Sequence, residues 1–252
     1  MSGLFDLSGK AAIVTGSTRG IGRAIAEALI AAGARVMISS EDPADTARVA
    51  AELGMPGCPC DVSDDAALAH LVAESLEVFG RIDHLVCNAG ITGKPGSFSQ
   101  IDMDDYARVM AINLRSQVVL CNLALPHIAA SGGGAALLMA SLSALRGNLR
   151  INAYALAKAG VAQLARNLAV EWGPSGVRVN AISPGFIATE LSQPLLDDAA
   201  FMARRMAMTP LRRPGTPDEV AGAAVFLAAP AGAFVTGHNL VIDGGTLITD
   251  GS

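Results

Sequence analysis

The stretch Thr15-Gly16-Ser17-Thr18-Arg19-Gly20-Ile21-Gly22 decides the fold. It ends the apolar run 11–15 and opens an amphipathic run over 20–32, so the pattern predicts a strand, a tight turn and a helix. Glycine permits the turn and lets a phosphate approach the backbone, and free N–H groups at a helix start favour an anion. The spacing G-x-x-x-G-x-G differs from the dinucleotide fingerprint G-x-G-x-x-G and from a P-loop. The stretch therefore predicts a phosphate cradle, with a plain glycine-rich turn as the alternative.

Short apolar runs alternate with longer amphipathic runs along the rest of the chain. Strands are expected at 11–15, 35–39, 57–60, 84–88, 135–140, 178–183 and 239–242. Helices are expected at 20–32, 44–53, 64–79, 103–130, 151–172 and 217–228, with Asp64 as an N-cap and Gly80 as a stop. Because parallel neighbours need crossovers, this alternation predicts an α/β fold with a doubly wound, seven-stranded parallel sheet of Rossmann-like type. Ligands of such sheets bind beyond the carboxyl ends of the strands.

The composition describes one globular domain. Of the 252 residues, 51% are hydrophobic and 16% are charged, which excludes a disordered chain and supplies a large core. No repeat or linker divides the sequence, so residues 1–252 are expected to form a single domain. The net charge of −5 provides no basic face for a phosphate backbone, so a nucleic-acid partner is not expected.

The sequence predicts neither a membrane span nor a metal site. Residues 116–145 carry no Lys, Arg, Asp or Glu, but Pro126 and Gly132–Gly134 interrupt them, which favours a buried helix, a turn and a buried strand. The N-terminus lacks the features of a signal peptide, so the cytoplasm is the expected compartment. The four cysteines include a C-P-C pair with no histidine nearby, so reduced, buried thiols are expected and no metal.

A second motif brings a phenol and an ammonium group together. Tyr154 and Lys158 are four residues apart in an expected helix and therefore share one face. A neighbouring ammonium stabilises the phenolate, which is expected to lower the pKa of Tyr154 from about 10 and let it donate or accept a proton. Ser141 lies 13 residues earlier, at the end of an expected strand, and can reach the same edge of the sheet. For Y-x-x-x-K alone, an exposed tyrosine and a solvated lysine are the alternative.

Together these motifs make the chain resemble the short-chain dehydrogenase/reductase family, in the branch with T-G-x-x-x-G-x-G and Y-x-x-x-K motifs. The likeness covers nearly the whole chain. Beyond the two motifs it rests on Asp61-Val62, Asn88-Ala89-Gly90, Asn113, Ser141, Pro184-Gly185 followed by Thr189, and Asp243-Gly244-Gly245. It implies hydride transfer between a nicotinamide cofactor and a secondary alcohol or ketone, a sugar or a cyclic hydroxy compound.

The resemblance also implies a catalytic tetrad of Asn113, Ser141, Tyr154 and Lys158. Tyr154 would be the general acid in reduction and the base in oxidation, and Ser141 would hydrogen-bond the reacting oxygen. Lys158 would hold the nicotinamide ribose and lower the pKa of Tyr154. Asn113 would hold a water molecule of a proton relay.

Further residues are expected to contact the cofactor in addition to Tyr154 and Lys158. They fall in the glycine turn, after the second, third and fourth expected strands, and after the strand that ends near 183. They are Gly16, Thr18, Arg19, Gly20, Ile21, Gly22, Ser40, Glu41, Asp61, Val62, Asn88, Ala89, Gly90, Pro184, Gly185, Ile187 and Thr189.

The choice between NAD and NADP depends on the end of the second strand. An acid about 20 residues past the glycines can bind the ribose 2′-OH and repel a 2′-phosphate. Glu41 lies 41 − 22 = 19 residues past Gly22. In the family the acid for NAD usually falls at the position of Ser40, and the arginine for NADP often at that of Glu41. Arg19 could approach a 2′-phosphate, but repulsion by Glu41 favours NAD, with NADP left open.

A substrate lid is expected at about 190–214, with other walls at 92–97 and 142–152. These segments contain cations that either face an anionic or polyhydroxy substrate or are ordinary solvated side chains: Lys94, Arg146, Arg150, Arg204 and Arg205.

A 3-oxoacyl-carrier-protein reductase is an alternative function, weakened because 127–134 and 173–175 lack the basic residues that meet an acidic carrier. A cofactor-binding regulatory protein without turnover is the other alternative. The family's long apolar helices imply a homotetramer.

Overall fold

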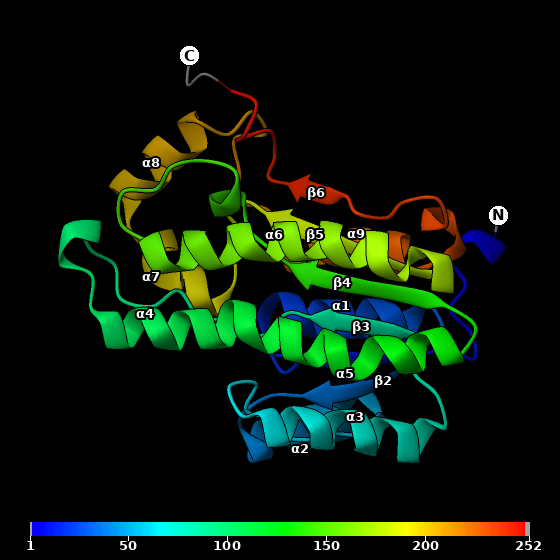
Figure 1. Ribbon diagram of the computed structural model, residues 1–252. Coiled ribbons are helices and arrows are strands. Elements are labelled where there is room, and N and C mark those ends of the chain that lie inside the picture. The colour runs from blue at the N-terminus through cyan, green and yellow to red at the C-terminus, as the bar shows by residue number, and fades with distance from the viewer. Residues whose placement is uncertain (1, 250–252) are drawn as a thin grey trace.

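Six strands form one parallel sheet in the computed structural model, which describes residues 2–249. The strands are β1 (Ala11–Thr15), β2 (Arg35–Ser39), β3 (His84–Cys87), β4 (Gly134–Met139), β5 (Val177–Pro184) and β6 (Asn239–Ile242). They pair in the order β2-β1-β3-β4-β5-β6, and all their carboxyl ends point to the same side (Figure 1). The chain leaves β1 first toward β2 and then returns to β3 on the other side. The switch point between β1 and β3 therefore opens a crevice at their carboxyl ends.

The seventh strand expected at 57–60 is not confirmed among the described residues. This segment runs beside β2, where the Cys58 and Cys60 amides donate to the carbonyl oxygens of Ile38 and Ser40 at 2.9 and 2.8 Å. Only one bridge forms, between Ile38 and Gly57. Pro59 lies between these two donors, so its nitrogen faces away from β2 and its lack of an N–H group is tolerated at the edge of the sheet.

Helices cover both faces of the sheet. They are α1 (Gly20–Ala31), α2 (Pro43–Leu53), α3 (Asp65–Phe79), α4 (Met103–Met110), α5 (Ser116–Ala130), α6 (Asn152–Trp172), α7 (Gln193–Leu196), α8 (Ala199–Ala207) and α9 (Pro217–Ala228). One buried apolar cluster joins the sheet to α3, α5 and α6, and a second joins it to α1, α2 and α9. In Figure 1 α5 and α6 lie in front of the sheet and α1 and α9 behind it. The doubly wound α/β architecture is thus as expected.

Helix ends follow from local sequence signals. Asp64 caps α3 by accepting from the amide of Ala66, and Gly80 ends that helix with a φ of 73°, as predicted. Asp42 caps α2 in the same way, and Gly54 ends it with a φ of 63°. Asp42 and Asp64 thereby fix the loops after β2 and before α3, which carry part of the candidate cofactor site.

The apolar segment after residue 102 forms a packed layer of the fold. Met103–Ala130 is helical throughout, with a π-helical turn at Ala111–Arg115 between α4 and α5. Its length and composition alone would suit a membrane span, yet many of its side chains are buried within the fold. Leu120, Cys121 and Leu125 belong to the core cluster on this face of the sheet. Burial against the sheet thus accounts for its apolar residues.

A buried aspartate joins the amino ends of three strands. Asp83, with no exposed surface, accepts from the amide of Ala11 at 3.0 Å, from Lys10 at 3.0 Å and from Arg81 at 2.6 Å. Burial raises the pKa of the Asp83 carboxyl, but the hydrogen bonds from Arg81, Ala11 and Lys10 outweigh it and lower the pKa below its ordinary value. The backbone of Asp83 also accepts from Ala135 at the start of β4. This cluster lies at the end of the sheet opposite to the switch point.

Candidate active site

The glycine turn leads from β1 into α1 and has the shape of a phosphate cradle. Gly16 and Gly20 have φ angles of 63° and 56°, which residues with a side chain rarely adopt. A Cβ on Gly22 would lie 2.1 Å from the carbonyl oxygen of Gly16 and 2.3 Å from Nδ2 of Asn88. No side chain caps α1 at Arg19, so the N–H groups of its first turn are available to an anion. These features fit the pyrophosphate of a dinucleotide.

Thr15 and Asn88 join the ends of β1 and β3 beneath this cradle. The Thr15 hydroxyl accepts from the amides of Asn88 and Ala89 at 3.0 and 3.2 Å. The Asn88 side chain donates to the carbonyl oxygens of Thr15 and Gly16 at 3.0 and 3.1 Å. Asn88 therefore shapes the cradle from below. The structural role of Thr15 was not expected; its position at the end of the first strand is the only local signal for it.

The chain that follows β5 returns to the glycine turn. Thr189 lies beside Gly20, since a Cβ on Gly20 would be 3.6 Å from Cγ2 of Thr189. Ser192 forms a capping box with Thr189 and also donates to the carbonyl oxygen of Ile187 at 2.8 Å. A bridge between Ile187 and Gly215 fixes the same segment from the other side. The structure thus brings Thr189, far away in sequence, beside Gly20 of the glycine turn.

Lys158 is buried at the carboxyl end of β4. Its side chain is 3% exposed, and Nζ donates to the carbonyl oxygen of Met139 at 2.6 Å and lies 5.6 Å from the ring centre of Tyr154. Burial lowers the pKa of Lys158 to about 8, although the neighbouring Cys87 acts in the opposite direction. Because this value lies above neutrality, the ammonium form predominates at neutral pH.

Tyr154 is next to Ser141 at the same edge. Burial raises the pKa of the Tyr154 phenol, and a hydrogen bond with Ser141 lowers it in part. The net direction is therefore opposite to the expected lowering by Lys158. Lys158 directs its ammonium to Met139, so loss of water around the phenol has the larger effect. Tyr154 is consequently held as a neutral phenol, which is the form that donates a proton.

Asn113 completes the predicted tetrad from the π-helical turn. It has no exposed surface, and its side-chain amide exchanges two hydrogen bonds with the backbone of Ile91, at 2.8 and 2.7 Å. Gly90 leaves room here, because a Cβ on it would meet Oδ1 of Asn113 at 2.7 Å. Gln117, which sequence reasoning missed, donates to the backbone carbonyl of Asn113 at 3.0 Å. A polar residue one turn after Asn113 in an apolar helix was the available signal.

Comparison with known proteins assigns this arrangement to a family. A family model described as "Enoyl-(Acyl carrier protein) reductase" matches residues 16–246. The D-threitol dehydrogenase of Mycolicibacterium smegmatis is 39% identical over 249 residues, which cover 97% of this chain and 95% of that protein. The chain belongs to the short-chain dehydrogenase/reductase family. The resemblance seen in the sequence is thereby confirmed.

Solved structures of other short-chain dehydrogenases have the same fold. A gluconate 5-dehydrogenase from Burkholderia cenocepacia, in complex with NADP and tartrate, is 32% identical with a TM-score of 0.95, and the match covers 98% of this chain and 99% of that one. A 7α-hydroxysteroid dehydrogenase complexed with NADH and 7-oxo glycochenodeoxycholic acid is 34% identical with a TM-score of 0.92, covering 97% of both chains. These relatives support a nicotinamide cofactor for this short-chain dehydrogenase/reductase.

The loops after β2 and beside it would meet the adenosine half of the cofactor in this short-chain dehydrogenase/reductase. Arg19 and Glu41 are both exposed and form an ion pair at 3.5 Å across the mouth of the cradle. Ser40 is buried, and its hydroxyl donates to the carbonyl oxygen of Asp42 at 3.2 Å. Val62 is buried, whereas Asp61 is exposed and accepts from Ser63. Glu41, not Ser40, is therefore the exposed side chain at the end of β2, and it is paired with Arg19.

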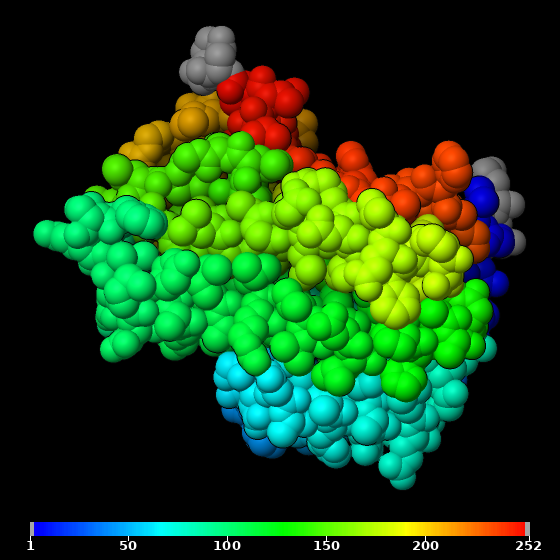
Figure 2. Space-filling model, viewed as in Figure 1, coloured from blue at the N-terminus to red at the C-terminus, as the bar shows by residue number. Residues whose placement is uncertain are grey.

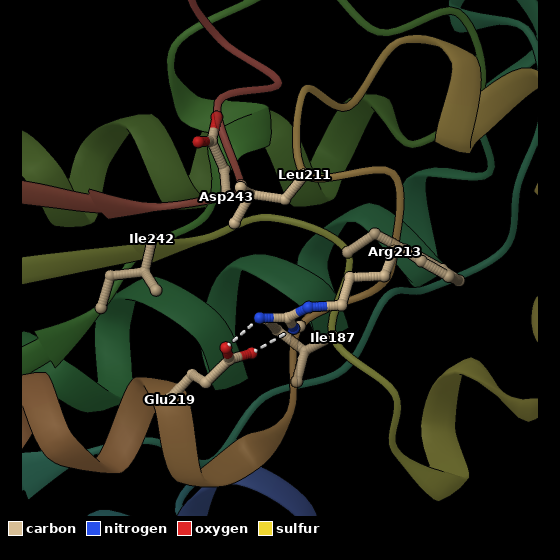
Figure 3. A pocket seen from close by; sticks show the side chains of 9 residues that line it. Ile187, Leu211, Arg213, Glu219, Ile242 and Asp243 are labelled. Atoms are coloured by element: carbon tan, nitrogen blue, oxygen red, sulfur yellow. Dashed lines mark hydrogen bonds and ion pairs between the residues drawn. The ribbon is translucent and has the colours of Figure 1, made fainter.

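The expected lid contains α7, α8 and the loop after them (Figure 1). A small pocket of about 90 Å³ lies beneath this loop, and Figure 3 shows Leu211 and Asp243 on one side of it and the ion pair of Arg213 with Glu219 on the other. Each Arg213 nitrogen reaches a separate carboxylate oxygen of Glu219, at 2.9 and 2.6 Å. This pair fixes the end of the lid to the start of α9.

The other two expected walls of the substrate site, 92–97 and 142–152, contact each other. The Gly96 amide donates to the carbonyl oxygen of Arg150 at 2.8 Å, and the Asn152 side chain donates to Gly96 at 3.1 Å. A second pocket, of about 350 Å³, lies between these segments and is lined by Leu149 and Arg150 among others. Lys94 is turned away from it and pairs with Asp102 at 2.7 Å. Of the cations considered, Lys94 is thus satisfied by a neighbour on the surface.

Proposed function

We propose that this protein transfers a hydride between a nicotinamide dinucleotide and a secondary alcohol or ketone, with Tyr154 as the general acid or base. The observation that carries the proposal is the group of Tyr154, Ser141 and Lys158 at the carboxyl end of β4. A buried neutral phenol beside a serine hydroxyl is suited to neutralise the oxygen of a carbonyl as it is reduced. The bound nicotinamide supplies or accepts the hydride.

Each side chain of the tetrad has a distinct task in this proposal. In reduction Tyr154 donates its proton to the substrate oxygen, and in oxidation its phenolate removes the hydroxyl proton. The Ser141 hydroxyl holds the same oxygen, since it already lies within hydrogen-bonding reach of Tyr154. Lys158, whose ammonium form predominates at neutral pH, would hold ribose hydroxyls. Asn113, fixed by Ile91, would orient the water that carries the proton outward.

The purified protein with NADH or NADPH and a panel of ketones, oxo acids, sugars and oxo esters tests this function. Loss of the near-ultraviolet absorbance of the reduced nicotinamide, with formation of the alcohol by mass spectrometry, is the expected result. Binding of NADH without any turnover over the whole panel would contradict the proposal and support the regulatory alternative. Turnover of only carrier-linked oxo esters would support the carrier-protein reductase instead.

We infer that the substrate is a polyol, a sugar derivative or a cyclic hydroxy compound. The relatives compared above are named for threitol, gluconate and a hydroxysteroid, all of which carry secondary hydroxyl groups. The second pocket, between 95–97 and 149–150, is open enough for a chain of hydroxylated carbons. The acidic carrier of the alternative would need basic residues at 127–134 and 173–175, which are absent.

We propose NAD as the preferred cofactor, because Glu41 is the exposed acid at the mouth of the cradle. The ion pair also neutralises Arg19, the cation that a 2′-phosphate would need. Glu41→Gln is expected to tighten NADPH binding about fivefold, the factor that corresponds to about 1 kcal/mol for two charges 4 Å apart in water. Fluorescence titration with NADPH and NADH measures the change. Glu27→Gln, which removes a similar exposed partner from Arg23 on α1, is the control; equal effects of both variants would contradict the preference.

We propose that the protein is a homotetramer in which α4, α5 and α6 contribute the interface. These helices form the face seen in Figure 2, and α6 exposes Leu156 and Val170, the latter at 81%. Exposed apolar side chains on a helix that also packs on the core are typical of an interface between subunits. Light scattering at micromolar concentration should give four times the 25.6 kDa of one chain. A single-chain mass would contradict this assembly.

We propose the cytoplasm as the compartment. Cys58, Cys60, Cys87 and Cys121 are all free and buried in the structure. Unpaired thiols are typical of a reducing compartment.

A further inference from the structure

Arg205 on the lid helix α8 has an unsatisfied polar group in a buried place. Its Nε atom is buried and has no hydrogen-bond acceptor among residues 2–249. Its guanidinium carbon lies 5.8 Å from the ring centre of Phe186, and Phe186 in turn packs edge-on against Phe201 of α8. A buried donor without an acceptor is uncommon in proteins, and it is a natural contact for a ligand atom.

A second arginine lies close to the first. Burial lowers the pKa of Arg205, the positive charge of Arg146 lowers it further, and Asp243 raises it. Asp243 does not pair with either guanidinium, because its two carboxylate oxygens accept from the amides of Gly245 and Leu247 at 2.8 and 2.6 Å. Arg146, Arg205 and Asp243 thus carry a net charge of +1 together, in a half-buried place.

The arginines lie on the substrate side of the tetrad. Arg146 is five residues after Ser141, in the loop that begins with the 3-10 turn Leu142–Ala144. Phe186 directly follows Pro184-Gly185, which comes after β5 and leads to the segment beside the glycine turn. The stretch 142–152 and α8 were both expected to line the substrate, and the structure brings one arginine from each together.

We propose that Arg205, assisted by Arg146, binds the carboxylate of the substrate, so that the protein acts on hydroxy acids or oxo acids. The inference rests on the proposed hydride transfer and narrows its substrate class. A guanidinium binds a carboxylate through two parallel hydrogen bonds, and the Phe186 ring packs near this guanidinium. A net charge of +1 matches a singly charged carboxylate better than a doubly charged phosphate ester.

Neighbouring cations do not offer the same site. Arg204, one residue earlier on α8, is exposed and lies 5.9 Å from the ring centre of Phe201. Arg213 is already paired through both of its outer nitrogens with Glu219. Of these arginines, Arg205 is therefore the one with a buried N–H group that has no acceptor among the described residues.

Two matched pairs of compounds test the inference: D-gluconate with D-glucitol, and D-threonate with D-threitol. Within each pair, a carboxylate replaces a terminal CH₂OH group. Calorimetric binding to the wild-type protein saturated with NADH, and KM in oxidation with NAD, should both favour the acid. Arg205→Gln is expected to raise Kd and KM for the acids about 10- to 100-fold, the effect of losing a charge-assisted hydrogen bond, with kcat little changed. The values for the polyols should stay the same.

Arg204→Gln is the matched control and should leave all of these constants unchanged. Arg205→Lys keeps the charge but loses the planar pair of donors, so it should show an intermediate effect. Circular dichroism and NADH affinity verify that each variant is folded. A wild-type preference for both polyols, or equal binding of the acids by the wild type and Arg205→Gln, would overturn the inference. If D-glucitol 6-phosphate binds more tightly than gluconate and loses this advantage in Arg205→Gln, the choice of carboxylate is overturned.

The two proposals fail in different ways. If no compound is turned over, hydride transfer is contradicted, while calorimetry still reports whether Arg205 binds an acid. If polyols are oxidised and acids neither bind nor react better, the hydride transfer stands and the carboxylate site does not.

Discussion

Tyr154→Phe is expected to lower kcat by about 10²- to 10⁴-fold in both reaction directions, the range typical of a lost general acid or base. The substitution removes one oxygen from a side chain that is already positioned beside Ser141 and Lys158. The ring remains, so the packing of α6 and the affinity for NADH should not change. Steady-state kinetics, combined with fluorescence titration of NADH, measure the two effects separately.

Tyr106→Phe provides the matched control, because the chain has only two tyrosines and Tyr106 lies in α4, outside the tetrad. Its kcat should equal that of the wild type. Burial raises the pKa of Tyr154, so the reduction rate of the wild type should stay level through neutrality and fall only in alkaline solution. The oxidation rate, which needs the phenolate, should rise with pH. A Tyr154→Phe variant that retains wild-type kcat would show that another group transfers the proton.

Gly22→Ala should abolish tight cofactor binding and destabilise the fold. A methyl group would occupy a position 2.1 Å from the Gly16 carbonyl oxygen and 2.3 Å from Nδ2 of Asn88, so the glycine turn and the end of β3 must move apart. Overpacking of this kind costs about 1–3 kcal/mol of unfolding free energy. A displaced cradle should also weaken NADH binding by about tenfold or more, since about 1.4 kcal/mol of lost contact corresponds to tenfold.

Gly222→Ala is the control for this change. Gly222 also lies in a helix, α9, but nothing is within 4 Å of the position of its Cβ. Alanine should there raise stability slightly, by about 0.5–1 kcal/mol, because it favours the helix. Denaturant unfolding and NADH titration of both variants separate the two positions. Equal NADH affinity in Gly22→Ala and the wild type would mean that the turn does not hold the dinucleotide.

Local patterns in the sequence were enough to predict most elements. Periodicity located all six expected helices within a few residues, and Asp64 and Gly80 fixed the two ends of α3. The resemblance to the short-chain dehydrogenase/reductase family implied the tetrad, whereas the glycine turn was predicted as a short motif at the carboxyl end of an apolar run. Parallel strands bring their carboxyl ends to one edge of the sheet. The glycine turn and Ser141, which both follow strands, could therefore be placed at one edge without knowledge of the strand order.

Features that depend on distant contacts were not predictable in this way. The segment 57–60 is apolar enough for a strand, but it forms a single bridge with β2, which its own sequence does not reveal. The pKa direction of Tyr154 depends on how deeply the ring is buried and on where Lys158 directs its ammonium. Gln117 is an ordinary residue in a helical pattern, and only the fold shows that it supports Asn113. Arg205 was one of several candidate cations of the lid, and only the fold shows that it packs against Phe186.

The buried carboxylate of Asp83 has a consequence for how this protein can evolve. Its bonds to Lys10, Ala11 and Arg81 secure the sheet at the end where no chemistry takes place. The loops at the opposite end, including the lid, contribute little to that anchor. Substitutions there can accumulate and alter which molecule is accepted while the framework persists. Proteins descended from one ancestor with this framework can therefore differ in substrate without a change of fold.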